Sequence, residues 1–492
     1  MSHRKLLTLA LTTAGVLAMT AINTPASVAE DTGATETTQA SSADQYENSV
    51  VTIVVQLTDD APALADMKER VNAAVAAAVP GASATGLREY THALHGFAIK
   101  APASSLAAIR ATPGVKAAFV DRHSATIYNV YQPNSSDDED QGKDNDPSHS
   151  TAMDMTAAAQ ATHRGSGQVI EIIDTGFDTS HSAFAGSVEG ARLSQADVTS
   201  LAATLGEGRG GGWVSAKIPF AYDYADGDAD VTYPAPGEFP DQTDDARYTH
   251  GTHVAALAAA NGSEFRGAAP DAQLIMAKVL GNDDQDINDS VLLAALDDAA
   301  VLTPDVLVVS VGDDSGQNGD ALAVYADVYA ALTAKGVAIN APAGDYTSSA
   351  WGNWNSDNLP FVTDADYGAI IWPALDSNAL ATASLDEVEK RDGEPLPGAT
   401  PSLFSSWGVT PDLRLKPEIA APGGDVMSAL PAGTYGRRAG TAEASAQVAG
   451  IAALVRQRIA DDPMFAGMSA ADKDAVVANF LMGTAHPVVD AT

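Results

Sequence analysis

Five apolar segments separated by helical segments stand out in the part of this chain that follows residue 150. Several are rich in valine and isoleucine, as in VLVVSV. Apolar runs without polar alternation are typical of strands buried on both faces, which occur in parallel sheets covered by helices. The pattern predicts an α/β fold with a central parallel sheet whose strands include residues 168–173, 274–279, 306–311, 336–341 and 379–384.

Three short motifs add polar groups to this framework. VIEIIDTGFDTSH ends an apolar strand on Asp174, and HGTHVAALAAA places His250 at the expected start of a small-residue helix. GTAEASAQVAG opens another helix with Gly-Thr, followed by Ala442. A carboxylate that orients a histidine base is one half of a serine-hydrolase site, and the other half is a hydroxyl nucleophile. The methyl group of Ala442 cannot attack a carbonyl.

The order Asp, His and Gly-Thr-X resembles that of the subtilisin-like serine proteases, or subtilases. This resemblance implies a subtilisin-like three-layer fold with a central parallel sheet. It also implies the roles of a peptide-bond hydrolase: Asp174 as the orienting carboxylate, His250 as the general base and position 442 as that of the serine nucleophile. Glu443 and Ala446 stand where the family has Met and Pro. These flanking changes favour natural loss of the serine over a deliberate single exchange.

Two further positions bear on catalysis and on substrate binding. Asp345 stands where the family has the Asn that donates to the oxyanion; an ionised carboxylate would repel that charge, whereas a protonated one could donate if burial raised its pKa well above ~3.9. Ser310, Val311 and Gly312 resemble the segment that pairs with the substrate backbone. Because extended peptides bind there by strand addition, a peptide-binding groove can persist without hydrolysis. The sequence therefore indicates a pseudoprotease, and the alternative is an active subtilase carrying a deliberate Ser→Ala exchange at 442.

Longer segments resemble lactocepin-type cell-envelope proteinases of Gram-positive bacteria. They include KIPFAYDYADGDADV, the ATASLD strand, and FSSWG followed by LKPEIAAPGGDVMSALP. The resemblance implies an extracellular or surface-associated protein. This chain departs from those enzymes because only about fifteen residues separate ATASLD from FSSWG, where they carry a long inserted domain.

The N-terminal part divides into four regions. A basic start, an apolar run and the small residues Ser27-Val28-Ala29 predict a signal peptide over 1–29, and a polar leader follows over 30–48. Alternating strands and helices over 49–123 predict a small α/β module. Its His95-Gly96-Phe97 and Pro113-Gly114-Val115 resemble the signature of the inhibitory subtilase prodomain. An acidic linker over 124–150 then precedes the peptidase domain, 151–492.

Charge and composition limit the partners. The net charge is −37, and nearly all of it lies after residue 130, which argues against nucleic acid as a ligand. The expected partners are a protein or peptide and the chain's own prodomain, with no membrane span after signal cleavage. The absence of cysteine leaves core packing or bound ions to stabilise an exported protein. No cofactor is expected, and alternating Asp226, Asp228 and Asp230 are calcium candidates, with a solvated acidic loop as the alternative.

Overall fold

The computed structural model describes residues 49–121, 123–124, 146–147, 150–206, 208–235, 245–284, 286–312, 319–346, 370–386, 390–391, 394–395, 400–410 and 413–488. The expected signal peptide and leader, and most of the expected linker, lie outside these described residues.

The N-terminal module is a four-stranded antiparallel sheet in the order β2-β3-β1-β4, with two helices on one face. Alternation along the first strand sets its two faces. Ile53, Val55 and Leu57 pack with the helices, and Val54 joins the core of the larger domain. The sheet has one strand more than expected, β2. The elements are β1 (Val50–Leu57), α2 (Leu64–Ala78), β2 (Thr85–Tyr90), β3 (Gly96–Pro102), α3 (Leu106–Arg110) and β4 (Val115–Val120).

The larger domain is built on a seven-stranded sheet in the order β17-β12-β11-β10-β6-β8-β7. Every neighbouring pair is parallel. The five expected strands lie together in this sheet, which gains β7 and β17 at its two edges. The strands are β6 (Val169–Asp174), β7 (Phe220–Asp223), β8 (Gln273–Lys278), β10 (Val306–Val309), β11 (Ala338–Pro342), β12 (Ala379–Asp386) and β17 (Ile419–Gly424).

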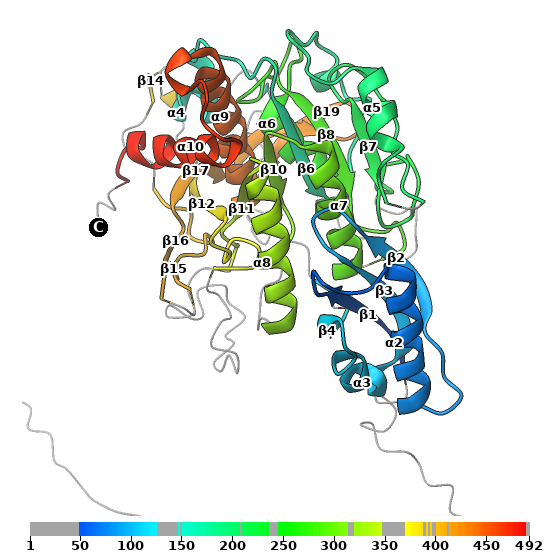
Figure 1. Ribbon diagram of the computed structural model, residues 1–492. Helices are drawn as coiled ribbons and strands as arrows, with labels where there is room; N and C mark the ends of the chain where they lie inside the picture. Colours follow the sequence, from blue (N-terminus) through cyan, green and yellow to red (C-terminus); the bar gives the residue numbers. More distant parts are fainter. Residues whose placement is uncertain are drawn as a thin grey trace, which may run out of the picture. The chain divides into compact units, whose positions relative to one another are not determined.

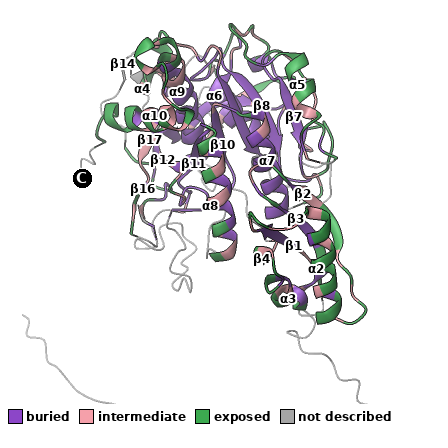
Figure 2. Ribbon diagram, viewed as in Figure 1, coloured by how far each residue is buried: buried purple, intermediate pink, exposed green. Residues whose placement is uncertain are grey.

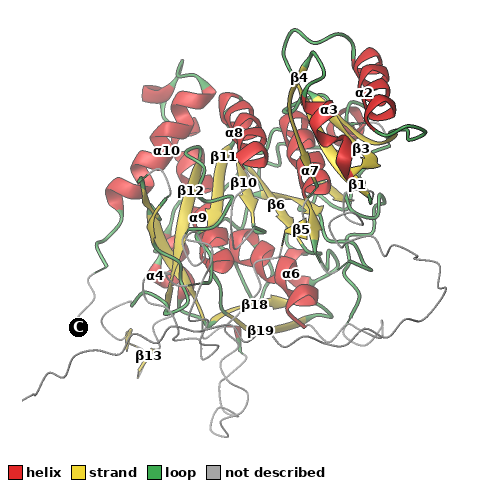
Figure 3. Cartoon of the chain, turned by 90° about the horizontal axis from the view of Figure 1, so that it is seen from below, coloured by secondary structure: helices red, strands yellow, loops and turns green. Residues whose placement is uncertain are grey.

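Two pairs of long helices cover the sheet (Figures 1 and 3). Helices α6 (Asp245–Ala259) and α9 (Thr441–Asp461) lie on one face, and α7 (Asp289–Leu302) and α8 (Gly319–Ala334) lie on the other. Strand β6 serves both layers, since Ile170 and Ile172 pack with α6 and α9 while Val169 and Ile173 face the other core. The burial pattern in Figure 2 agrees with this, because the strands and the inner helix faces are buried. The expected α/β fold is confirmed.

Shorter elements complete the larger domain. Helix α10 (Ala470–Thr484) packs against α9, and among the described residues no helix is long and apolar enough to cross a bilayer. The other elements are α4 (Ala152–Met155), α5 (Gln195–Ala202) and the antiparallel pairs β5 (His123–Ser124) with β9 (Ile287–Asn288), β13 (Lys390–Arg391) with β14 (Glu394–Pro395), β15 (Gly408–Val409) with β16 (Leu415–Lys416), and β18 (Val426–Leu430) with β19 (Thr434–Arg438).

The N-terminal module and the larger domain belong to one compact unit, residues 46–492, and a buried aspartate on α7 joins them. The Asp297 carboxylate accepts backbone N–H bonds from all four residues of the segment 91–94, at 2.8–3.1 Å. Arg209 lies beside it, 3.3 Å from Asp297 and 3.4 Å from Asp298, and donates to the carbonyl of Glu89. The charge of Asp297 is therefore balanced by Arg209 of the larger domain, and its hydrogen bonds come mainly from the module.

A second buried carboxylate, Glu171, lies in the middle of β6. It is fully buried, and neither carboxylate oxygen has a hydrogen-bond partner among the described residues. Burial, and then the nearby Asp298 charge, raise the pKa of Glu171 well above its ordinary value. The folded protein therefore holds a proton on Glu171 at a pH where the unfolded chain has lost it.

The Glu171 proton makes stability depend on pH. Because the folded-state pKa is raised, this contribution to stability is complete below the unfolded-state value of ~4.3 and is lost as the pH rises. Glu171→Gln keeps the shape without the ionisation, so its melting temperature relative to the unmodified chain should increase between pH 5.5 and pH 8.5. A gain of ~1 kcal/mol would raise it by roughly 2–4 °C. Parallel melting curves for the two proteins across this range would contradict the assignment.

Candidate active site

Asp174 is the last residue of β6, at the carboxyl edge of the sheet, and it is fully buried. Loops at this edge form the ligand sites of open parallel sheets. The Oδ1 atom of Asp174 accepts hydrogen bonds from the backbone N–H of Thr175 at 2.6 Å and from the Thr175 hydroxyl at 3.1 Å. It also lies 2.8 Å from Nδ1 of His250. These bonds hold the carboxylate of Asp174 against Nδ1 of His250.

His250 lies inside α6 rather than at its start. The helix begins at Asp245, so the expected boundary was wrong by five residues. Residues 245–249 (DARYT) lack the run of small residues that follows His250, although they are compatible with a helix. The next residue, Gly251, allows the helix to approach β6, because a Cβ there would lie 2.2 Å from the carbonyl oxygen of Gly176.

The electrostatics of the His250 site are dominated by carboxylates. Burial favours the neutral ring, but the charge and hydrogen bond of Asp174, and then the charges of Glu443 and Asp345, outweigh burial and raise the pKa of His250 to about 9. The imidazole is therefore cationic at neutral pH, with Nδ1 directed to Asp174. A histidine in this state binds a proton too tightly to act as an efficient base near pH 7.

Ala442 is the second residue of α9 and is fully buried. The helix start is fixed by a bond from the N–H of Gly440 to the carbonyl of Gly423, at 2.9 Å. Ser445, one turn further along α9, is also fully buried. The side chain at position 442 is a methyl group, which provides no nucleophile.

Asp345 follows β11 and is brought against the start of α9. Its Oδ1 accepts bonds from the backbone N–H and the hydroxyl of Thr441, both at 2.8 Å, and the same hydroxyl accepts a 3.0 Å bond from the N–H of Gly344. Gly344 has φ +112°, in the left-handed region where a side chain would be strained. Burial raises the pKa of Asp345 to about 7, against the opposing effect of the Thr441 bonds. Asp345 is therefore ionised above neutral pH.

The segment Ser310–Gly312 follows β10 at the same edge of the sheet. The N–H of Ser310 donates to the carbonyl of Ile173 at 3.1 Å, which extends the pairing with β6 toward Asp174. Gly312 packs on the backbone of Trp372, where a Cβ would lie 2.2 Å from the carbonyl oxygen. The segment lies where the sequence places it, and its role in substrate binding stays a prediction.

Glu443 was not predicted as a site residue, although its charge, after that of Asp174, helps to raise the pKa of His250. It is buried, and its Oε1 lies 3.4 Å from Nδ1 of His253. Burial raises the pKa of Glu443, but His253 and His250 outweigh burial and lower it below its ordinary value. The available signal was the HGTH motif, which places a second histidine one turn after His250 and facing α9.

The aspartates of the acidic loop after β7 accept hydrogen bonds from nearby backbone and side-chain groups. Asp226 accepts from the N–H of Asn282 at 3.0 Å and lies 3.5 Å from the ammonium group of Lys278. Asp228 accepts from the N–H of Asp230, and Asp230 accepts from both the N–H and the hydroxyl of Thr232. These aspartates thus accept hydrogen bonds within the loop and from Asn282, and calcium binding there stays a prediction.

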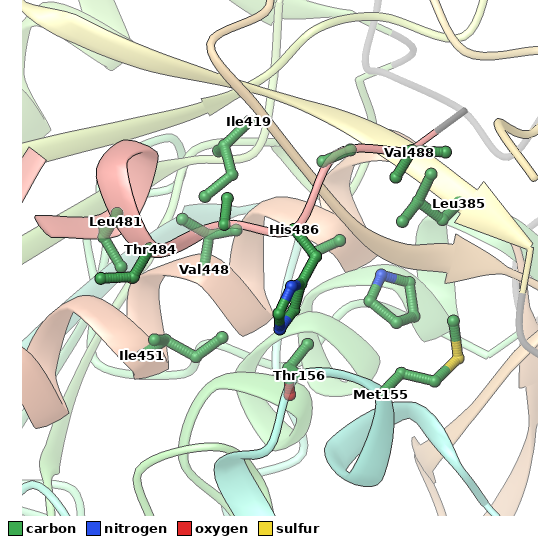
Figure 4. A pocket seen from close by; sticks show the side chains of 14 residues that line it. Met155, Thr156, Leu385, Ile419, Val448, Ile451, Leu481, Thr484, His486 and Val488 are labelled. Carbon is green, nitrogen blue, oxygen red and sulfur yellow. The ribbon is translucent and has the colours of Figure 1, made fainter. Parts of the chain in front are cut away.

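Two cavities of the larger domain differ in whether their lining residues adjoin Asp174 and His250 in sequence. A cavity of about 380 Å³ between α4, α9 and the segment after α10 is lined by apolar side chains and by His486, as Figure 4 shows. Neither Asp174 nor His250 lines this cavity. A smaller cavity of about 290 Å³ is lined by residues that adjoin the pair in sequence, among them Phe177 and Tyr248.

Comparison with known proteins identifies the fold and its two parts. The subtilase family profile matches residues 165–491, and the peptidase inhibitor I9 profile matches residues 30–126. This chain belongs to the subtilase family. The expected resemblance to subtilases with an inhibitor-type prodomain is confirmed.

Curated relatives support the assignment. The chain is 28% identical over 276 residues to the PI-type proteinase of Lactococcus lactis subsp. cremoris, a match that covers 53% of this chain and 13% of that protein. It is 27% identical over 300 residues to thermitase of Thermoactinomyces vulgaris, covering 59% of this chain and 75% of thermitase. It is 31% identical over 211 residues to subtilisin BL of Lederbergia lenta, covering 42% and 63%. The matched part is thus a small fraction of the lactococcal proteinase.

The raised pKa of His250 can be tested by nuclear magnetic resonance on histidine-labelled protein. The unmodified subtilase chain should show His250 titrating near pH 9. Asp174→Asn removes the largest favourable charge, so the pKa should fall by more than ~1 unit toward the ordinary ~6.5. Asp178→Asn, on the following loop, serves as the control and should leave the titration unchanged. An unshifted His250 in Asp174→Asn would show that Asp174 does not hold the charge on the ring.

Proposed function

We propose that this subtilase is a pseudoprotease, an exported family member that keeps a peptide-binding groove and has lost hydrolysis. The observation that carries the proposal is Ala442, at the start of α9, where the family motif places the serine nucleophile. Asp174 and His250 are joined at 2.8 Å, so the base and its orienting carboxylate persist without a hydroxyl to activate.

The residue changes act on two separate parts of the chemistry. Removing the serine costs on the order of 10⁶ in turnover, a value measured for subtilisin, a member of the same family. Removing one oxyanion donor costs roughly 10²–10³, also measured for subtilisin. Above neutral pH the ionised Asp345 is worse than a missing donor, because its charge opposes the oxyanion. Either change alone would leave a poor enzyme.

Peptide binding makes different demands. An extended peptide needs a strand edge with free backbone groups and pockets for alternate side chains, and it needs no nucleophile. Ser310–Gly312, which continues the β6–β10 pairing toward Asp174, is the edge that we assign to this role. We further infer that the protein acts outside the cell, because residues 1–29 have the composition of a signal peptide.

A second candidate is an active subtilase altered by a deliberate Ser→Ala exchange. It is favoured by the intact Asp174–His250 contact, which a decaying site need not retain. The two candidates differ in what a restored serine would do: an engineered knockout regains full activity, and a decayed site does not.

The unmodified chain should not hydrolyse chromogenic peptides at neutral pH or above. At a pH well above 7, where Asp345 is ionised, Ala442→Ser should restore little activity, and Ala442→Ser with Asp345→Asn should be roughly 10²–10³ faster than the single variant, because the Asn amide replaces a charge with a donor. Adding Ser445→Ala to the double variant is the matched control and should change nothing. Turnover by the unmodified chain that disappears in His250→Ala would contradict the proposal, and full activity of Ala442→Ser alone would favour the engineered enzyme.

The groove is tested with the same variants. Peptides selected from a display library for binding to the unmodified chain should be cleaved by the Ala442→Ser, Asp345→Asn variant, since both properties use one groove. Selected peptides that resist cleavage and do not compete with a cleaved substrate would place binding elsewhere on the surface.

The dead nucleophile also predicts an uncut prodomain. In the family, the catalytic serine removes the prodomain from its own chain, and Ala442 cannot perform that step. Intact mass spectrometry of protein secreted from a host without extracellular proteases should show a chain that begins near Glu30 and retains residues 50–122. A dominant species starting between residues 123 and 150 would show self-cleavage, and position 442 would then not be the site of the nucleophile.

A further inference from the structure

We propose that a pocket next to the catalytic segments receives one basic side chain of the bound peptide, and that Asp178 is the residue that selects it. The inference rests on the proposed peptide-binding groove and names the class of peptide that the groove takes. The pocket has a volume of about 290 Å³. Because pockets for whole small molecules measure roughly 300–1,000 Å³, this one suits a single side chain.

The three segments that carry the catalytic positions all contribute to the wall of this pocket. The loop after β6 supplies two residues that follow Asp174 closely, and α6 supplies the residue two positions before His250. The turn between β18 and β19, from which the chain leads to α9, supplies two more. The lining residues from these segments are Phe177, Asp178, Tyr248, Pro431 and Ala432.

Hydrogen bonds join these segments at Asp178. Its backbone N–H donates to the Thr252 hydroxyl on α6 at 2.9 Å, and its Oδ2 accepts from the N–H of Ala432 at 3.0 Å. The N–H of Phe177 donates to the carbonyl of Val231 at 2.7 Å, which connects the loop after β7 to the same wall. The pocket is therefore held against the segments that position Asp174 and His250.

The pocket and the strand edge assigned to peptide binding lie on opposite sides of β6. In the sheet, β10 pairs with β6 on one side, and β8 and then β7 follow on the other. Ser310–Gly312 continues from β10, whereas residues 232–235 of the pocket belong to the loop after β7. A peptide that pairs with Ser310–Gly312 and continues past Asp174 therefore reaches the pocket after a fixed number of residues, each spanning about 3.3 Å.

The lining combines aromatic walls with one charge. Three of the lining residues are aromatic, and Asp178 is the only one with a charged side chain. Its carboxylate accepts the N–H and the hydroxyl of Ser180 at 3.0 and 2.6 Å, besides the N–H of Ala432. None of these donors carries a positive charge. Because an ionised carboxylate has about four acceptor positions, Asp178 can accept a further bond from a ligand.

A basic side chain suits this lining better than an apolar one. An apolar side chain would remove water from the Asp178 charge without replacing it, which is costly. The aliphatic stem of Lys or Arg can instead lie along the aromatic walls while its cationic end reaches the carboxylate. The net charge of −37 also attracts basic peptides, but this long-range attraction does not select one position of the peptide.

The test selects peptides from a random display library on the full unmodified chain and, in parallel, on three variants. Peptides selected by the unmodified chain should share Lys or Arg at one aligned position. Replacing that residue by Ala should weaken binding to the unmodified chain at least about 10-fold, and binding to Asp178→Asn far less, because Asn keeps the size of the side chain without its charge. Asp178→Lys should select Asp or Glu at the same position.

Glu189→Gln is the matched control. It removes one exposed carboxylate of the larger domain that does not line the pocket, so it should select the same peptides as the unmodified chain. This variant separates the effect of net charge from that of the pocket.

Two outcomes would overturn the assignment to Asp178 while peptides still bind, and both would leave the proposed groove intact. One is a basic position that Asp178→Asn and Asp178→Lys select as strongly as the unmodified chain does. The other is a set of peptides in which no position favours a basic residue, including a set that shares an apolar residue instead. Failure of all four proteins to select any peptide would contradict the groove itself, and the pocket assignment with it.

Discussion

The parallel pairing of β6 between β8 and β10 is the constraint on which the rest of the site depends. It buries both faces of β6, so its chain direction and register are fixed by two separate hydrophobic cores. With the strand fixed, Asp174 must lie at the carboxyl edge, and the segment after β10 must lie beside it. Helices α6 and α9, which share one of these cores, bring His250 and Ala442 to the same edge. The 2.8 Å contact between Asp174 and His250 thus follows from packing and does not depend on a hydroxyl at position 442.

The sequence was most informative where burial alone decides structure. Uninterrupted apolar runs can be paired in few ways, so the five central strands and the position of Asp174 could be predicted. The edge strands β7 and β17 were not, because edge positions tolerate tyrosine, proline and glycine, and the periodic signal is lost. Strand β2 (TGLREY) is largely exposed and alternates weakly, which explains its absence from the expected module.

The charge of the site could be predicted only in part. Asp345 could be identified because a short motif fixes its position, and the ordinary pKa of a carboxyl group implies that only burial could keep it protonated near neutral pH. Whether the pKa is raised depends on how deeply the loop after β11 is covered, which no local pattern encodes. The same holds for Glu443, since its importance comes from the contact between two helices about 190 residues apart in sequence. The charge of a site that is assembled from distant segments can be predicted only when the fold is known.

Asp297 has a consequence for the larger domain as a folding unit. The four backbone N–H groups that it accepts come from a segment some 200 residues earlier in the chain. Without that segment, a buried charge on α7 would keep Arg209 and lose most of its donors, and the cost would fall on the domain itself. The N-terminal module therefore supplies most of the hydrogen bonds that stabilise a buried carboxylate of the larger domain. A cut between the segment matched by the inhibitor profile and the segment matched by the subtilase profile would thus leave the larger domain with a buried charge that lacks most of its hydrogen-bond donors.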